Sequence, residues 1–193
     1  AAIAKHHPAE ADFYFELAEA YRKSGMPDKA IGMFEQAIQR KPDYLPAVRG
    51  LGATLARSGR LQQAGETLRK AVAAMPEDAS LVSDLGLVYV GLGKTQEAID
   101  TLQKASRLDP DYPDTYNNLG GAKLRLGDRA GAEAAYRTAI ELQPDFAEAH
   151  KNLANLLVGP DRFAEAQYHF QRAVKSNPKY AAAYYDYGMA LAQ

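Results

Sequence analysis

The sequence predicts an all-α protein: an α-solenoid of helix–turn–helix repeats, with five complete 34-residue repeats and a C-terminal half repeat. The first observation is a proline that recurs every 34 residues, at Pro8, Pro42, Pro76, Pro110, Pro144 and Pro178. The second is a set of small and large apolar residues that keeps the same register. A chain built from one repeated unit places each residue type at the same structural point in every unit, whereas a single globular core has no reason to do so.

Each repeat begins three residues after a proline. The predicted array spans 1–193 and divides into a lead over 1–10, repeats at 11–44, 45–78, 79–112, 113–146 and 147–180, and a half repeat at 181–193. The seventh place of each full repeat is apolar and large: Leu17, Leu51, Leu85, Leu119 and Leu153. The eighth place is small: Ala18, Gly52, Gly86, Gly120 and Ala154. Small residues let two helices approach closely, and large ones fill the space beside that contact.

The helices follow from these signals in order. First helices are predicted at 11–24, 45–58, 79–92, 113–126, 147–158 and 181–192, and second helices at 28–41, 62–75, 96–109, 129–142 and 162–176. A glycine stands where most first helices must end, because glycine accepts the left-handed conformation of a helix C-cap: Gly25, Gly59, Gly93 and Gly127. The recurrent proline cannot continue the second helix. An aspartate follows three of the prolines and is predicted to cap the next helix: Asp43, Asp111 and Asp145.

Residues 80–112 and 115–146 resemble the ideal unit of the tetratricopeptide repeat (TPR) family, and the resemblance extends over nearly the whole chain. It implies a right-handed superhelix whose first helices line a concave groove that binds peptides. The fourth place departs from the tryptophan that the family favours, since it holds Tyr14, Val48, Val82, Tyr116, His150 and Tyr184. We expect His150 to be a packed core histidine. In the fifth repeat Gly159 and Pro160 come early, which predicts a shortened first helix.

Composition excludes several classes of function. The net charge is −1 without a basic block, so neither nucleic acid nor a membrane surface is an expected partner. No apolar run approaches the ~18 residues that span a bilayer, and a soluble protein is expected. Cysteine is absent, which excludes disulfides and thiolate chemistry. No metal-ligating histidine spacing, phosphate-binding loop or nucleophile motif occurs, so we expect no enzyme activity and no cofactor. The first residue is not Met, which leaves room for an upstream region.

The groove is the candidate binding site. Aligned with the family, the places that face it give a predicted peptide-binding set: Arg49, Asp84, Asn117, Asn118, Lys151, Asn152 and Asn155. An asparagine amide both donates and accepts hydrogen bonds, which suits an extended peptide backbone. The alternative is that these asparagines bond to neighbouring helices or face water.

Both ends of the array are open in the sequence. The first eight residues resemble only the tail of a preceding second helix. The half repeat is a first helix without its second, and it predicts a terminal interface at Tyr184, Tyr187 and Leu191 that supports weak self-association. The predicted function is a non-enzymatic scaffold that binds a protein or an extended peptide. The alternatives are a structural subunit that assembles end to end, and the recognition arm of an enzyme whose catalytic domain lies outside this chain.

Overall fold

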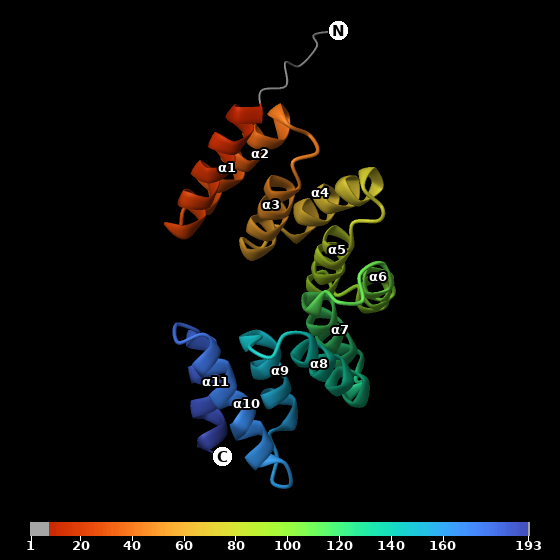
Figure 1. The fold of residues 1–193 in the computed structure, drawn as a ribbon, viewed down its shortest axis with the longest axis vertical. Helices are drawn as coiled ribbons and strands as arrows, with labels where there is room; N and C mark the ends of the chain where they lie inside the picture. Colours follow the sequence, from red (N-terminus) through yellow and green to blue (C-terminus); the bar gives the residue numbers. More distant parts are fainter. Residues whose placement is uncertain (1–7, 193) are drawn as a thin grey trace. The chain divides into compact units, whose positions relative to one another are not determined.

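The computed structural model describes residues 8–192, and the described chain is all-helical (Figure 1). Helices alternate with short turns, as the 34-residue period predicts. In chain order the helices are α1 (Pro8–Lys23), α2 (Pro27–Arg40), α3 (Leu45–Arg57), α4 (Leu61–Ala74), α5 (Ala79–Gly91), α6 (Thr95–Leu108), α7 (Pro113–Leu126), α8 (Arg129–Leu142), α9 (Ala147–Leu157), α10 (Phe163–Ser176) and α11 (Ala181–Leu191).

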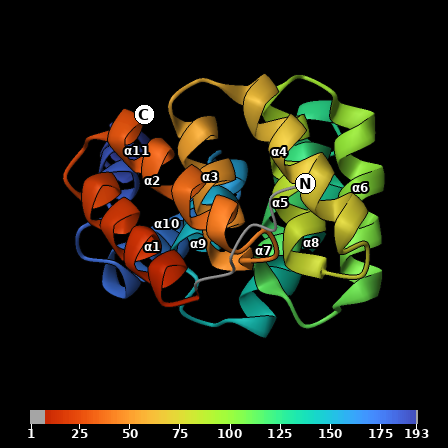
Figure 2. The same ribbon diagram turned by 90° about the horizontal axis from the view of Figure 1, so that it is seen from above.

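The chain divides into two compact units, which are described separately. Unit 1 covers residues 1–94 with α1 to α5, and unit 2 covers residues 95–193 with α6 to α11. Within each unit, consecutive helices pack on one another and first helices of successive repeats also touch, as α1, α3 and α5 do. Figure 2 shows α1 and α2 lying side by side, as they do in Figure 1. The single array over 1–193 remains a prediction.

Left-handed glycines end the first helices of the first four repeats, as predicted. Gly25, Gly59, Gly93 and Gly127 have φ values of 71°, 76°, 75° and 89°. After Gly59, the Arg60 amide donates to the Leu55 carbonyl at 2.9 Å, which satisfies a carbonyl that the helix end would otherwise leave free.

The fifth repeat ends its first helix differently. Helix α9 stops at Leu157 with only 11 residues, and Val158 leaves the helical conformation with ψ of 120°. Pro160 disfavours the helical conformation at Gly159, the residue directly before it, so the helix has to end ahead of this early Gly159–Pro160 pair. The shortened helix predicted for this repeat is confirmed.

Two local predictions were wrong. Pro8 does not end a preceding helix but begins α1, three residues before the predicted start, because its fixed φ suits the first position of a helix. Residues 1–7, the rest of the predicted preceding helix, lie outside the described chain.

The capping aspartates were also misplaced. The N-caps of α3, α7 and α9 are Tyr44, Tyr112 and Phe146, none of which makes a side-chain cap hydrogen bond, so Asp43, Asp111 and Asp145 stand one residue too early. The carboxylates that do cap are Asp78, which accepts from the Leu81 amide at 3.0 Å, and Asp128, which accepts from Gly131 at 2.8 Å.

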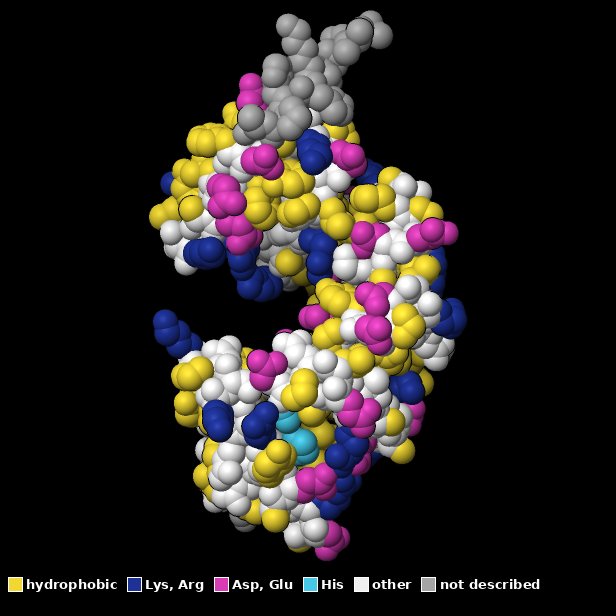
Figure 3. Space-filling model, viewed as in Figure 1, with side chains coloured by type: hydrophobic (Ala, Val, Ile, Leu, Met, Phe, Trp, Pro, Cys, Tyr) yellow, Lys and Arg dark blue, Asp and Glu magenta, His cyan; other side chains and the backbone are white. Residues whose placement is uncertain are grey.

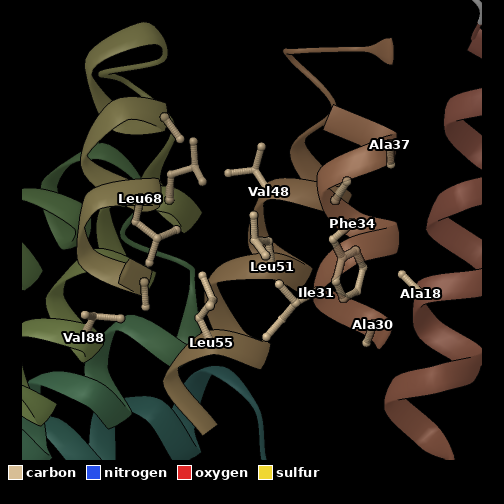
Figure 4. Close-up of a cluster of buried hydrophobic side chains, with 14 of the residues drawn as sticks. Ala18, Ala30, Ile31, Phe34, Ala37, Val48, Leu51, Leu55, Leu68 and Val88 are labelled. Carbon is tan, nitrogen blue, oxygen red and sulfur yellow. The ribbon is translucent and has the colours of Figure 1, made fainter. Parts of the chain in front are cut away.

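The core of unit 1 lies between its five helices, α1 to α5. Phe34 of α2 is completely buried, and Leu51 of α3 and Leu68 of α4 are buried in the same cluster. Figure 4 shows Phe34 beside Ala18 of α1, with Leu51 between α2 and α4. Leu51 stands at the seventh place of its repeat, and Phe34 and Leu68 stand at the twenty-fourth place of theirs. The large seventh-place residue therefore fills space beside the close helix contact, as predicted, and the twenty-fourth-place residues do the same.

Candidate functional site

The first helices of unit 1 enclose a cavity of about 540 Å³ lined only by residues of α1, α3 and α5. Phe15 and Leu45 supply apolar surface, and Ala53 lies exposed on the wall that α3 forms. Successive first helices place the same repeat positions side by side, so the cavity arises from the 34-residue register itself. This is the groove that the family resemblance led us to expect, within unit 1.

Arginines dominate the charge of this groove. Arg22, Arg49 and Arg57 line it, and Figure 3 shows basic side chains gathered where α1 and α3 end. Arg22 Nε donates to Glu19 Oε1 at 2.9 Å, and this contact holds the pKa of Glu19 below its ordinary value. Exposed Arg57 forms no ion pair with the described residues and so is available to an anionic group.

Arg49 and Asp84, both predicted groove residues, bind each other. Arg49 Nε donates to Asp84 Oδ2 at 2.6 Å, which links α3 to α5. The pair joins the fifth place of one repeat to the sixth place of the next. Most of their charge is therefore already balanced within the groove.

Unit 2 repeats the same relationship twice. Asn152 Nδ2 donates to Asn117 Oδ1 at 2.9 Å, and Lys151 Nζ lies 3.9 Å from Asp186 Oδ2. Both contacts again join a fifth place to the following sixth place. Asn155 at a ninth place donates to Asp186 Oδ2 at 2.7 Å. Polar residues on the first helices thus form a ladder between repeats, which we call the fifth–sixth ladder.

The ladder changes what the predicted asparagines can do. Asn117 is only 4 % exposed, so it positions Asn152 rather than offering its own amide to a ligand. Asn118 is half-buried on α7. For Asn117, Asn152 and Asn155, the structure shows the helix-to-helix contacts that were the alternative to peptide binding; a further role in binding remains a prediction.

A buried histidine pair lies between α9 and α10. His150 is 2 % exposed, as expected of a packed core residue, and its Nδ1 lies 2.8 Å from Nδ1 of His169. His150 Nε2 lies 3.1 Å from the Pro144 carbonyl oxygen. The carbonyl can only accept, so the His150 Nε2 carries hydrogen, its Nδ1 accepts, and His169 Nδ1 donates.

Burial lowers the pKa of both imidazoles below the ordinary histidine value. For His169, the neighbouring His150 and Arg137 lower the pKa further. No sequence pattern indicated that His169 would meet His150, since the two are brought together by antiparallel pairing of their helices. A patch of imidazole is visible at the surface of unit 2 in Figure 3.

The predicted terminal interface is divided in the structure. Tyr184 is 50 % exposed and Leu191 is 55 % exposed on α11. Tyr187 instead stacks on Phe170 with ring centroids 5.3 Å apart, and its hydroxyl accepts from Gln167 Nε2 at 3.1 Å. Tyr184 and Leu191 are therefore the accessible members of this set.

Within residues 8–192, no cluster of three or more His, Asp or Glu side chains is arranged to hold a metal ion. Over the same residues, no helix combines the length and the apolar character needed to cross a membrane.

The family model of the TPR-containing "Cilia and flagella-associated protein 70 C-terminal domain" matches residues 1–190. The chain belongs to this tetratricopeptide repeat family. No curated protein matches the chain by sequence.

Several solved structures share the fold. The thermophilic TPR protein TTC0263 of Thermus thermophilus is 26% identical with a TM-score of 0.85, covering 95% of this chain and 100% of that one. A crystal structure of MamA is 28% identical with a TM-score of 0.62, covering 86% and 96% of the two chains. The pilF protein of Pseudomonas aeruginosa, at 19% identity and a TM-score of 0.73, covers 95% and 88% and shows the fold alone. Membership of the TPR family supports a general role as a protein-interaction scaffold.

Proposed function

We propose that this TPR chain is a non-enzymatic scaffold that binds an extended segment of a partner protein in the groove formed by α1, α3 and α5. The observation that carries the proposal is the cavity of about 540 Å³ whose lining comes from first helices of three successive repeats. Its volume lies within the ~300–1,000 Å³ typical of binding pockets. An extended segment can follow such a groove from repeat to repeat.

The chemistry of the groove favours a segment that combines an apolar side chain with an acidic one. Phe15 and Leu45 offer apolar surface that a buried side chain would remove from water. Arg22 and Arg49 are paired with Glu19 and Asp84, so Arg57 is the cation best able to meet a carboxylate of the partner. A charge-assisted hydrogen bond from a guanidinium to a carboxylate is stronger than a neutral one.

Selection from a random-peptide phage library on the immobilised chain tests this proposal. Peptides that bind should lose affinity by about tenfold or more when Ala53→Arg fills the groove, which corresponds to ~1.4 kcal/mol. Ala73→Arg is the matched control, because Ala73 is likewise an exposed alanine but lies on α4 outside the groove. Peptides that bind both variants as tightly as the original chain would refute groove binding.

A second candidate surface is α11. Tyr184, Tyr185, Met189 and Leu191 are each at least half exposed there. We propose weak association of two copies of the chain through this helix, because contiguous exposed apolar surface favours contact with another protein.

A further inference from the structure

A second cavity in unit 1 lies on the side of the second helices. It has a volume of about 580 Å³ and is formed by α2 and α4 with α3 beneath them. Val48, Leu51 and Ala71 are buried at its base, and Ile38, Ala74 and Met75 complete its apolar walls. None of these residues lines the groove between the first helices, so this cavity is separate from the site of the proposed function.

The repeat register shows why the cavity is open. Val48 occupies the fourth place of its repeat, where an aromatic ring or imidazole stands in four of the six repeats: Tyr14, Tyr116, His150 and Tyr184. In the fifth repeat, the places of Val48 and Thr67 carry His150 and His169, whose rings are 5.1 Å apart and buried together. There Arg172, at the place of Lys70, also donates to the Pro144 carbonyl at 3.0 Å. The second repeat therefore lacks the ring that fills the same space in the fifth.

A second small residue widens this opening. In the first repeat, the Arg40 guanidinium at the thirtieth place lies 4.1 Å from the centre of the Tyr14 ring at the fourth. In the second repeat, the corresponding residues are Ala74 and Val48. Because the second repeat has neither the aromatic ring nor the long side chain, an open cavity with apolar walls remains there.

The rim of the cavity carries charge. Glu35 of α2 and Asp43 of the following turn stand on one side, and Lys70 of α4 stands on the other. None of the three forms an ion pair with another residue in the described part of the chain. The two carboxylates favour a basic group on whatever enters the cavity.

We propose that this cavity binds an aromatic side chain of a partner protein, a tryptophan or tyrosine with a lysine or arginine beside it. The ring takes the place that the missing fourth-place ring would occupy, against Val48, Leu51 and Ala71. A large aromatic group gains most from an apolar pocket of this kind, since its burial removes the greatest area from water. The basic neighbour then lies at the rim, near Glu35 and Asp43.

Titration with the tripeptide acetyl-Lys-Trp-Lys-amide tests the proposal directly. The chain contains no tryptophan, so fluorescence excited at wavelengths that indole absorbs and tyrosine does not reports only on the peptide's own indole. We expect the emission of the indole to shift to the blue and the shift to saturate, with a dissociation constant in the millimolar range or below. Acetyl-Lys-Ala-Lys-amide should not reverse this shift. Val48→Tyr restores the ring found in the first and fourth repeats and should weaken binding about tenfold or more.

Ala74→Arg, which restores the residue found in the first repeat, is a second blocking variant at an exposed position. Ala73→Arg is the control, because Ala73 is an exposed alanine on α4 that lines neither cavity, and it should leave tripeptide binding unchanged. The proposal is overturned if the folded chain gives no saturable shift, or if binding persists in Ala74→Arg and in a folded Val48→Tyr. If the chain forms dimers that Val48→Tyr abolishes, and it does not bind the tripeptide, then a second copy of the chain occupies the cavity. That result would also overturn the proposal.

Discussion

The ring of Tyr136 in α8 occupies the space that a side chain on Gly120 in α7 would need. A β-carbon on Gly120 would lie 2.6 Å from Tyr136 Cδ1 and Cε1, well inside contact distance. Gly52 and Leu68 stand at the same eighth and twenty-fourth places of the second repeat, and a β-carbon there would lie 3.1 Å from Leu68 Cγ. The small and large places that recur in the sequence are thus two halves of one contact between paired helices.

Gly120→Ala should lower the free energy of unfolding by about 1–3 kcal/mol, because the buried Tyr136 ring must shift to admit the methyl group. Gly121→Ala is the neighbouring control. Its β-carbon would meet nothing closer than Tyr136 Oη at 3.8 Å, so it should stabilise the helix by up to about 1 kcal/mol. Urea denaturation of both variants measures the difference, and equal effects would contradict the register.

Asn152→Ala should lower the free energy of unfolding by about 1–3 kcal/mol, because it leaves the buried Asn117 oxygen without its donor. Asn155→Ala removes a hydrogen bond of similar length from an exposed place on the same helix and should cost less than about 0.5 kcal/mol. Thermal or urea unfolding compares the two variants. If the costs were reversed, the fifth–sixth ladder would not be a stabilising element.

The histidine pair predicts acid sensitivity. The unfolded imidazoles take up protons near pH 6.5, whereas burial lowers the pKa values of His150 and His169 in the fold. The unfolded state therefore binds more protons below that pH, and stability should be full above pH 6.5 and fall as the pH drops below it. Arg137 of α8 and Arg172 of α10 face the pair and oppose its protonation. Unfolding midpoints measured from pH 7 down to 5 test this.

The double variant His150→Val, His169→Thr supplies the control, since it introduces the residues of the second repeat. It should lose most of the pH dependence in this interval. Asp145 and Glu165 lie near the pair and favour its protonation, so both are kept unchanged in the double variant. An unchanged pH dependence in the double variant would show that the pair is not responsible.

Weak self-association through α11 should depend on Leu191. Leu191→Glu should shift the chain towards the monomer at high concentration, because it places a charge on the exposed apolar face. Leu126→Glu in α7 is the matched control, since Leu126 and Leu191 are 57 % and 55 % exposed. Light scattering over a wide concentration range distinguishes them. A chain that stays monomeric throughout, or responds alike to both changes, would exclude this contact.

The sequence predicts the helices well because Gly25, Gly59, Gly93 and Gly127 must bear positive φ wherever a first helix turns back. It also predicts the core, since the same contact between paired helices recurs in every repeat. The caps predicted at Asp43, Asp111 and Asp145 were wrong because an N-cap must directly precede the helix. The 34-residue period does not determine the first residue of a helix that closely.

The candidate site was less predictable. Alignment indicated the face on which Arg49, Asp84, Asn117 and Asn152 lie, but not that they pair with one another across repeats. A regular offset between the fifth place and the next sixth place could have revealed the pairing. The cavity beside Val48 is space that the neighbouring side chains leave unfilled. Such a space is visible only in the three-dimensional packing.

Methyl NMR of the chain with a library-selected peptide tests the central claim most directly. The account predicts that the signals of Leu45 and Ala53, in the groove between the first helices, shift and saturate with added peptide. The signals of Ile38 and Met75, beside the second helices, should stay in place. Saturable shifts confined to Ile38 and Met75, with Leu45 and Ala53 unmoved, would contradict binding in the groove of α1, α3 and α5.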